Sequence, residues 1–199
     1  MNRFWLFLAG AVAGLALVGA QVAQATTVQR LTLQDLTKKS AGIVMARVED
    51  ASSSWDAAHR EIYSFYTLRV LEPVKGMKGQ TIVTLRQAGG TVDNTASVVP
   101  GMPSFRRGEE VVVFLTQNDA AGYPWVMGLQ QGKYSIVTSK DGVKSVRNDF
   151  AGTELVNQNG QRLSAPVSKD QPLNAFLDGI KTSLGEAGKV QVDPTTPTE

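Results

Sequence analysis

Residues 110–116 read Glu-Val-Val-Val-Phe-Leu-Thr, and this stretch decides the fold more than any other part of the chain. Residues 111–115 are all apolar, so the strand that they form carries apolar side chains on both faces. Such a strand has to be covered on both sides. We therefore expect one face to meet a barrel interior and the other to meet a terminal helix. The two faces are formed by Val111, Val113 and Leu115, and by Val112 and Phe114.

Further strands are predicted on both sides of this stretch. Apolar or alternating runs bounded by turn residues place them at residues 43–49, 60–74, 80–87, 125–129, 133–139 and 143–147. A polar loop, residues 50–59, separates the first two of these strands. Many strands at short spacing, joined by glycine-containing turns, favour an antiparallel sandwich or barrel. We predict a mainly β fold built on a five-stranded OB-like antiparallel Greek-key barrel.

A short helix is predicted before the barrel and a longer one after it. Thr32 and Asp35 have the spacing of a capping box, which places the first helix at residues 33–40, with Gly42 as its stop. Near the C-terminus, apolar residues recur at spacings of three and four, which indicates an amphipathic helix. These residues are Leu173, Phe176, Leu177, Ile180 and Leu184.

The chain begins with the pattern of a secretory signal peptide, residues 1–25. Arg3 precedes an uncharged apolar run, and Ala23 and Ala25 occupy the small-residue positions of a cleavage site. We expect the mature protein to begin at Thr26, to keep no stable membrane anchor, and to be exported to the periplasm or the medium of a bacterium. The other predicted segments are the barrel domain with its leading helix (26–150), a polar connection (151–170), the C-terminal helix (171–187) and a disordered tail (188–199).

The composition removes most routes to catalysis. The chain has no cysteine and a single histidine, His59, and it lacks the motifs of a nucleophile elbow or a phosphate-binding loop. Glu109 and Glu110 are neighbours, so in a strand they point to opposite faces and do not form a carboxylate pair. We expect no enzymatic activity, no metal and no cofactor. With 20 basic and 18 acidic residues, the net charge of +2 predicts no nucleic-acid surface.

The long connection at residues 87–107 is the predicted contact surface. About twenty residues without secondary structure are uncommon in a compact domain and are often functional. Two prolines stiffen the connection, and apolar residues stand beside arginines, a combination typical of interfaces. The alternative is that Phe105 covers one end of the barrel. The candidate binding residues are Met102, Pro103, Phe105, Arg106 and Arg107.

Three aromatic residues, Trp55, Tyr123 and Trp125, are candidates for a stacking platform of the kind found on nucleic-acid-binding OB folds. No clusters of Lys or Arg are interleaved with them. We therefore expect these rings to serve in core and loop packing.

Several strings resemble those of uncharacterised exported bacterial proteins. They are PGxPxFxxGE at residues 100–109, followed by VVVFL, then GLxQGKY at 128–134, and upstream YTLxV at 66–70 and KG at 75–76. The architecture is also similar to the netrin-like OB barrel of tissue inhibitors of metalloproteinases. In those inhibitors an N-terminal cysteine ligates the zinc of the target, and this chain has no cysteine, so no residue carries over as a ligand.

These observations together predict an exported, non-enzymatic binding or interaction module. The expected partner is another exported protein, whose identity the sequence does not indicate. Two alternatives stay open at this point. The protein could inhibit a co-exported protease through its loop at residues 100–105, or it could be a hydrolase whose acidic residues converge from separate loops.

Overall fold

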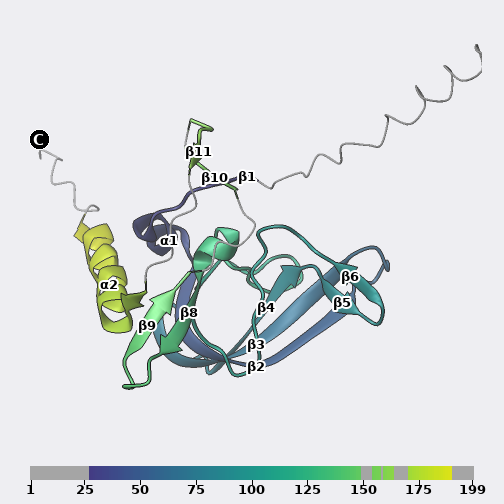
Figure 1. The fold of residues 1–199 in the computed structure, drawn as a ribbon, viewed down its shortest axis with the longest axis horizontal. Helices are drawn as coiled ribbons and strands as arrows, with labels where there is room; N and C mark the ends of the chain where they lie inside the picture. The colour runs from purple at the N-terminus through teal and green to yellow at the C-terminus, as the bar shows by residue number, and fades with distance from the viewer. Residues whose placement is uncertain (1–26, 149–153, 158, 164–169, 190–199) are drawn as a thin grey trace, which may run out of the picture.

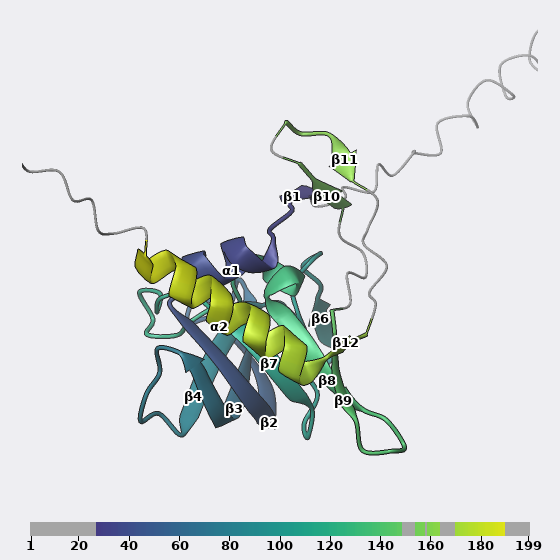
Figure 2. The ribbon, with the colours of Figure 1, turned by 90° about the vertical axis from the view of Figure 1, so that its left-hand side faces the viewer.

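The structure, a computed structural model, describes residues 27–148, 154–157, 159–163 and 170–189. The predicted signal peptide and the tail from residue 190 lie outside these ranges. An antiparallel sheet forms the centre of the molecule, and two helices lie together against one side of it (Figures 1 and 2). The mainly β fold with two helices is therefore confirmed.

The central sheet is strongly bent, and its longest pair of strands causes much of the bending. Its strands pair in the order β12-β9-β8-β7-β2-β3-β4, and three register shifts interrupt the β2–β3 pairing. Register shifts of this kind increase the local twist and bend a strand. The strands, in that order, are Gln171–Pro172, Lys144–Arg147, Lys133–Thr138, Glu110–Leu115, Gly42–Trp55, Ile62–Lys75 and Ile82–Ala88.

Two smaller sheets complete the described strands. β1 (Thr27–Gln29) pairs in parallel with β10 (Glu154–Val156), which pairs with β11 (Arg162–Leu163). β5 (Gly90–Val92) and β6 (Thr95–Ser97) form a hairpin at the end of the molecule remote from the helices (Figure 1). A 3₁₀ turn, η1 (Leu129–Gly132), leads into β8.

Residues 123–126 lie between the edge strand β4 and β7. Val126 forms a bridge with Leu115, and the Thr116 N–H donates to the Trp125 carbonyl over 2.9 Å. On the other side the Arg86 N–H donates to the Pro124 carbonyl over 3.1 Å. Among the described residues no ladder joins β4 to β8, so the sheet is not closed by regular strand pairing.

The central strand β7 is buried on both faces, as its sequence predicts. Val111, Val113 and Leu115 belong to a core that the bent sheet encloses. Val112 and Phe114 belong to a second core, which includes Leu36 of α1 (Leu33–Lys39) and Phe176, Leu177 and Ile180 of α2 (Leu173–Lys189). Every one of the five apolar β7 side chains is fully buried.

Helix α1 begins where its capping box predicts and ends at Lys39, with Ser40 as its C-cap, which is within one residue of the predicted end. The Asp35 N–H donates to Thr32 Oγ1 over 3.1 Å, and the Thr32 N–H donates to Asp35 Oδ2 over 3.0 Å. At the other end, Lys75 Nζ donates to the carbonyls of Thr37, Lys38 and Ser40 over 2.6–3.1 Å. A lysine from the β3 turn thus satisfies the last carbonyls of the helix.

Gly42 is the first residue of β2, and its role is packing. A Cβ at Gly42 would approach the Met77 side chain to 2.7 Å, so only glycine fits there without a shift. Gly42 is not the residue that ends α1, because the last carbonyls of the helix are satisfied by the Lys75 ammonium before the chain reaches Gly42.

Four other boundary predictions were also wrong, three of them because strand pairing overrides local polarity. The predicted polar loop at 50–59 is strand as far as Trp55, since β3 pairs with it throughout. The predicted strand at 125–129 is a single bridge, because η1 begins at Leu129. The connection at 87–107 contains the β5–β6 hairpin, and the polar connection at 151–170 contains β10 and β11.

Three residues of the string at 128–134 have clear structural roles. Gln131 is buried, and its Oε1 accepts from the Leu31 N–H over 2.7 Å, which ties the segment before α1 to the sheet. A Cβ at Gly132 would lie 2.1 Å from the Met127 carbonyl oxygen, so only glycine fits. The Tyr134 ring packs against Phe176, with ring centroids 4.5 Å apart.

Candidate functional site

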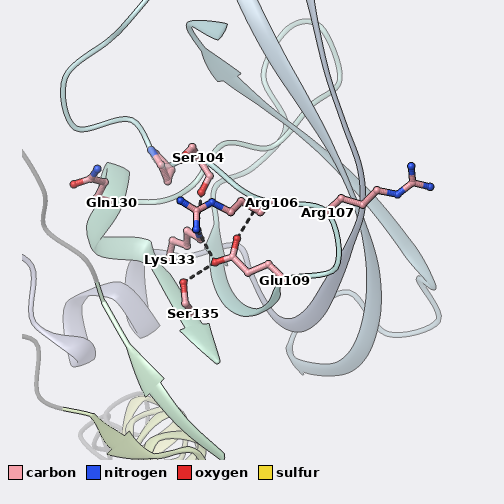
Figure 3. A pocket seen from close by; sticks show the side chains of 8 residues that line it. Ser104, Arg106, Arg107, Glu109, Gln130, Lys133 and Ser135 are labelled. Carbon is pink, nitrogen blue, oxygen red and sulfur yellow. Dashed lines mark hydrogen bonds and ion pairs between the residues drawn. The ribbon is translucent and has the colours of Figure 1, made fainter. Parts of the chain in front are cut away.

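A pocket of about 630 Å³ lies between the segment that enters β7 and the start of β8 (Figure 3). The entering segment belongs to the connection that the sequence predicts as a contact surface. β8 contributes side chains from alternate positions, which share one face of the strand. The pocket is lined by Pro103, Ser104, Arg106, Arg107, Glu109, Gln130, Lys133 and Ser135.

The Glu109 carboxylate is the centre of this pocket. Its Oε1 accepts from Ser135 Oγ over 2.6 Å and lies 2.8 Å from Lys133 Nζ. Its Oε2 accepts from the backbone N–H of Arg106 over 3.0 Å. The Lys133 ammonium also donates to the Ser104 carbonyl over 2.6 Å. The carboxylate is therefore held by three donors from two separate segments.

Burial and hydrogen bonding act in opposite directions on this carboxyl group. Burial raises the pKa of Glu109, while the bonds from Lys133, Ser135 and the Arg106 N–H lower it, and the net pKa lies below its ordinary value. Glu109 is therefore ionised at neutral pH. An ionised carboxylate with its oxygens engaged is poorly suited to donate a proton as a general acid.

Glu110 is engaged separately from its neighbour. Its two carboxylate oxygens pair with Arg47 and Lys144, at 2.8 and 2.7 Å respectively. The hydrogen bonds from Lys144 and Arg47 lower the pKa of Glu110, so this group is also ionised at neutral pH. The two adjacent carboxylates therefore serve two different ion-pair clusters.

The five predicted binding residues divide into three exposure classes. Arg106 and Arg107 are exposed, and neither has an ion pair with any residue that the structure describes. In Figure 3 the Arg106 side chain extends toward Ser104 and Lys133, whereas Arg107 points away from the pocket. Met102 is half-buried and Pro103 is buried.

Phe105 requires a correction, because it lies in the core and not on the contact surface. Its side chain is only 5% exposed, and its ring centroid lies 4.8 Å from that of Tyr66. Lys133 Nζ lies 4.7 Å from the centre of the same ring. The alternative prediction, in which Phe105 covers one end of the barrel, agrees with this burial.

Sequence reasoning missed Glu109, Lys133 and Ser135 as pocket residues. The sequence indicates for Glu109 only that it forms no carboxylate pair with Glu110, and it predicts the other two residues only as members of a strand. A signal was nevertheless present, since Lys133 and Ser135 are two residues apart in a predicted strand and share a face. Their common partner comes from a distant segment, which a single sequence does not reveal.

The aromatic residues considered for a stacking platform pack against three different partners, and Tyr123 lies edge-on to Phe65 with ring centroids 5.3 Å apart. The Arg86 guanidinium lies 4.5 Å from the centre of the Tyr63 ring and 5.5 Å from that of Trp125. Asp119 accepts from Arg86 and from the Trp125 indole N–H, over 2.7 and 2.6 Å. Elsewhere Trp55 stacks on the exposed His59 with ring centroids 5.7 Å apart. These contacts agree with the predicted packing role.

Neither a metal site nor a membrane-spanning helix is found in the described part of the chain. No three His, Cys, Asp or Glu side chains there are grouped so that they could hold a metal ion. Neither described helix is both long and apolar enough to cross a bilayer. Comparisons with models of protein families, with curated proteins and with solved structures found no match to this chain.

The lowered pKa of Glu109 predicts a pH-dependent contribution to stability. Because the folded pKa lies below the unfolded one, the contribution is present above the unfolded value and is lost as the pH falls through the folded value. We expect Glu109→Gln to cost about 1–2 kcal/mol at neutral pH, since a hydrogen bond to a charged group is lost. The cost should shrink on acidification.

Urea unfolding at neutral and acidic pH measures this difference, with Asp141→Asn in the exposed β8–β9 turn as the matched control. A Glu109→Gln cost that stays the same at both pH values would show that the charge of Glu109 contributes nothing to folding.

Proposed function

We propose that this protein is an exported, non-enzymatic binding module that holds an acidic segment of another exported protein. The segment would bind in the pocket of about 630 Å³ that Arg106, Glu109 and Lys133 line, called the Arg106 pocket below. The observation that carries the proposal is the charge balance of the pocket. Arg106, Arg107 and Lys133 supply three positive charges, and Glu109 supplies one negative charge that Lys133 already neutralises. The exposed Arg106 guanidinium therefore remains to bind a carboxylate from outside, and Arg107, which points away from the pocket, adds positive charge beside it.

The chemistry of arginine suits this role. A guanidinium group presents a planar fork of N–H donors that matches a carboxylate, and it stays charged at every physiological pH. Positive charge around a pocket also speeds the encounter with an acidic partner. Because Phe105 and Pro103 are buried beneath the same segment, the backbone that carries Arg106 is held in place before binding.

The proposal also includes export of the protein and an OB-like barrel fold. Export rests on the signal-peptide pattern of residues 1–25, which lie outside the described residues. For the fold, we infer an OB-like, partly open barrel of the netrin-like kind, built from β2, β3, β4, β7 and β8 with residues 123–126 between β4 and β7. The bridge at Val126 and the Arg86 to Pro124 hydrogen bond support this inference.

The two alternative functions have less support. A hydrolase would need a carboxyl group able to give up a proton, and the pKa values of Glu109 and Glu110 are both lowered. Inhibition of a co-exported protease would use the same loop, yet Phe105, its largest apolar residue, is buried in the core.

The test compares two fluorescent peptides, one rich in glutamate and a matched one in which glutamine replaces glutamate. We expect the acidic peptide alone to bind, with an affinity that falls as salt rises, because exposed charges are screened. Arg106→Ala should weaken binding about tenfold, the loss of roughly 1.4 kcal/mol from one charge-assisted contact. Lys140→Ala, an exposed cation in a remote turn, is the control.

Equal binding of the two peptides, or an equal affinity of the Arg106→Ala and Lys140→Ala variants, would contradict the proposal. A direct follow-up is capture from the exported fraction, with wild type compared with Arg106→Ala and Met102→Ala.

A further inference from the structure

A second cavity, of about 290 Å³, lies on the other side of residues 103–104 from the Arg106 pocket. Its walls come from the inner faces of β3 and β4, from the β5–β6 hairpin and from the segment at 97–104. Pro103 and Ser104 line both cavities. None of the residues that line this second cavity is charged at neutral pH.

Gln87 supplies an unpaired side-chain amide at this cavity. Its side chain is 1% exposed, lines the cavity, and faces Ser64 across the β3–β4 ladder. Neither its Oε1 nor its Nε2 has a hydrogen-bond partner among the residues that the structure describes. The hydroxyl of Ser64 donates to the Gly89 carbonyl over 2.8 Å and accepts from the Ser53 hydroxyl over 2.9 Å, and it makes no hydrogen bond to Gln87.

An unpaired amide inside a protein is costly. Each buried polar group without a partner costs about 1–3 kcal/mol, and native structures keep few of them. Gln87 leaves two such atoms side by side, one acceptor and one donor. The arrangement is therefore suited to a ligand that brings a donor and an acceptor at the same spacing.

Two glycines allow the start of the hairpin to pass closely over Ser53 and Ser64 and beside Ser97. Gly89 and Gly90 have φ angles of +91° and +142°. A Cβ at Gly90 would lie 2.5 Å from the hydroxyls of Ser53 and Ser64, and one at Gly89 would lie 2.7 Å from the Ser97 carbonyl oxygen. The backbone at these two glycines holds the β5–β6 hairpin in place as one wall of the cavity. The position of this wall therefore depends on the backbone and not on side-chain rotamers.

We propose that this cavity binds a neutral amide group, which pairs with Gln87 through two hydrogen bonds. In that pairing an N–H of the ligand donates to Gln87 Oε1, and its carbonyl accepts from Gln87 Nε2. A charged ligand is disfavoured, because no residue around the cavity could compensate a buried charge. The volume suits one or two peptide-type amides with small substituents.

The proposal does not depend on the Arg106 pocket, and its test is separate. Binding is measured by NMR on the ¹⁵N-labelled protein, through the backbone N–H signals of Gly89 and Gly90, which line the cavity, and in variants that keep Gln87 also through its side-chain NH₂ signal. The probes are N-methylacetamide, a free small amide, and N-acetylglycine N-methylamide, which carries two consecutive peptide bonds. Methyl acetate is the matched control probe, since it has nearly the same shape but no N–H.

We expect saturable shifts with amides, and binding at least about tenfold weaker for methyl acetate, since one hydrogen bond is lost. Gln87→Met should cause a similar loss, whereas Gln80→Met, at an exposed position, and Arg106→Ala should cause none. A preference for the two-bond probe identifies a peptide segment as the ligand, and equal affinity identifies a free small amide.

Stability gives an independent readout. Because Gln87→Met removes two unpaired atoms and keeps the side-chain length, we expect it to raise the urea midpoint or leave it unchanged. A fall in the midpoint would mean that the amide is already satisfied within the fold, and the proposal would be wrong. It would also be overturned if wild type bound methyl acetate as well as it binds the amides.

Discussion

Phe114→Ala is expected to lower the free energy of unfolding by about 3–5 kcal/mol, which is the range for large buried aromatic side chains. Phe114 has no exposed surface and lies on the helix-facing side of β7. Its ring contacts Tyr134 and Phe176, with centroid separations of 5.9 and 6.4 Å. The truncation would therefore open a cavity where the sheet and α2 meet.

The cost should fall at the upper end of the range because the surroundings cannot collapse easily. β7 is paired on both sides, with β2 and with β8, so its backbone cannot move into the space that the ring leaves. Helix α2 is held against the same core by Phe176 and Ile180, both fully buried. A cavity that stays open adds its own term to the lost burial.

Urea or thermal unfolding measures this cost, with Val143→Ala as the control, since Val143 is 60% exposed in the β8–β9 turn. The control should change stability by less than about 0.5 kcal/mol. A loss below about 1 kcal/mol for Phe114→Ala would place Phe114 outside the core and contradict the two-sided burial of β7.

The strands that the sequence predicts well are those whose hydrophobic pattern is local. β7 carries five apolar residues in succession, and that pattern fixes both of its faces without knowledge of its partners. The capping box of Thr32 and Asp35 is local in the same sense, because its two halves lie three residues apart. In both cases the residues that determine the structure lie within one short segment of the chain.

The features that the sequence does not reveal depend on partners far along the chain. The second half of β2 is rich in serine, and it is a strand only because β3 pairs with it. Lys75 caps the end of α1 by donating to the carbonyl of Ser40, 35 residues earlier in the chain. Glu109 meets Lys133 and Ser135 across 24 and 26 residues, so the pocket exists only once the sheet has formed.

Phe105→Ala is the second change with a large expected effect, a loss of about 3–4 kcal/mol in the free energy of unfolding. Phe105 is buried against Tyr66, so its removal leaves a cavity at one end of the core that the bent sheet encloses. The ring also lies beneath the Lys133 ammonium, which holds Glu109. Losing the ring should therefore loosen the pocket as well as the core.

A graded series separates the two effects. Phe105→Leu keeps most of the apolar volume but removes the ring face, so it should cost only about 1–1.5 kcal/mol. Arg106→Ala changes a neighbouring exposed side chain and should leave stability within about 0.5 kcal/mol while it weakens binding of the acidic peptide. If Phe105→Ala instead kept full stability and abolished peptide binding, Phe105 would be a contact residue after all. Core burial of Phe105 and surface recognition by Arg106 thus make opposite predictions at adjacent positions, and the pair of variants distinguishes them.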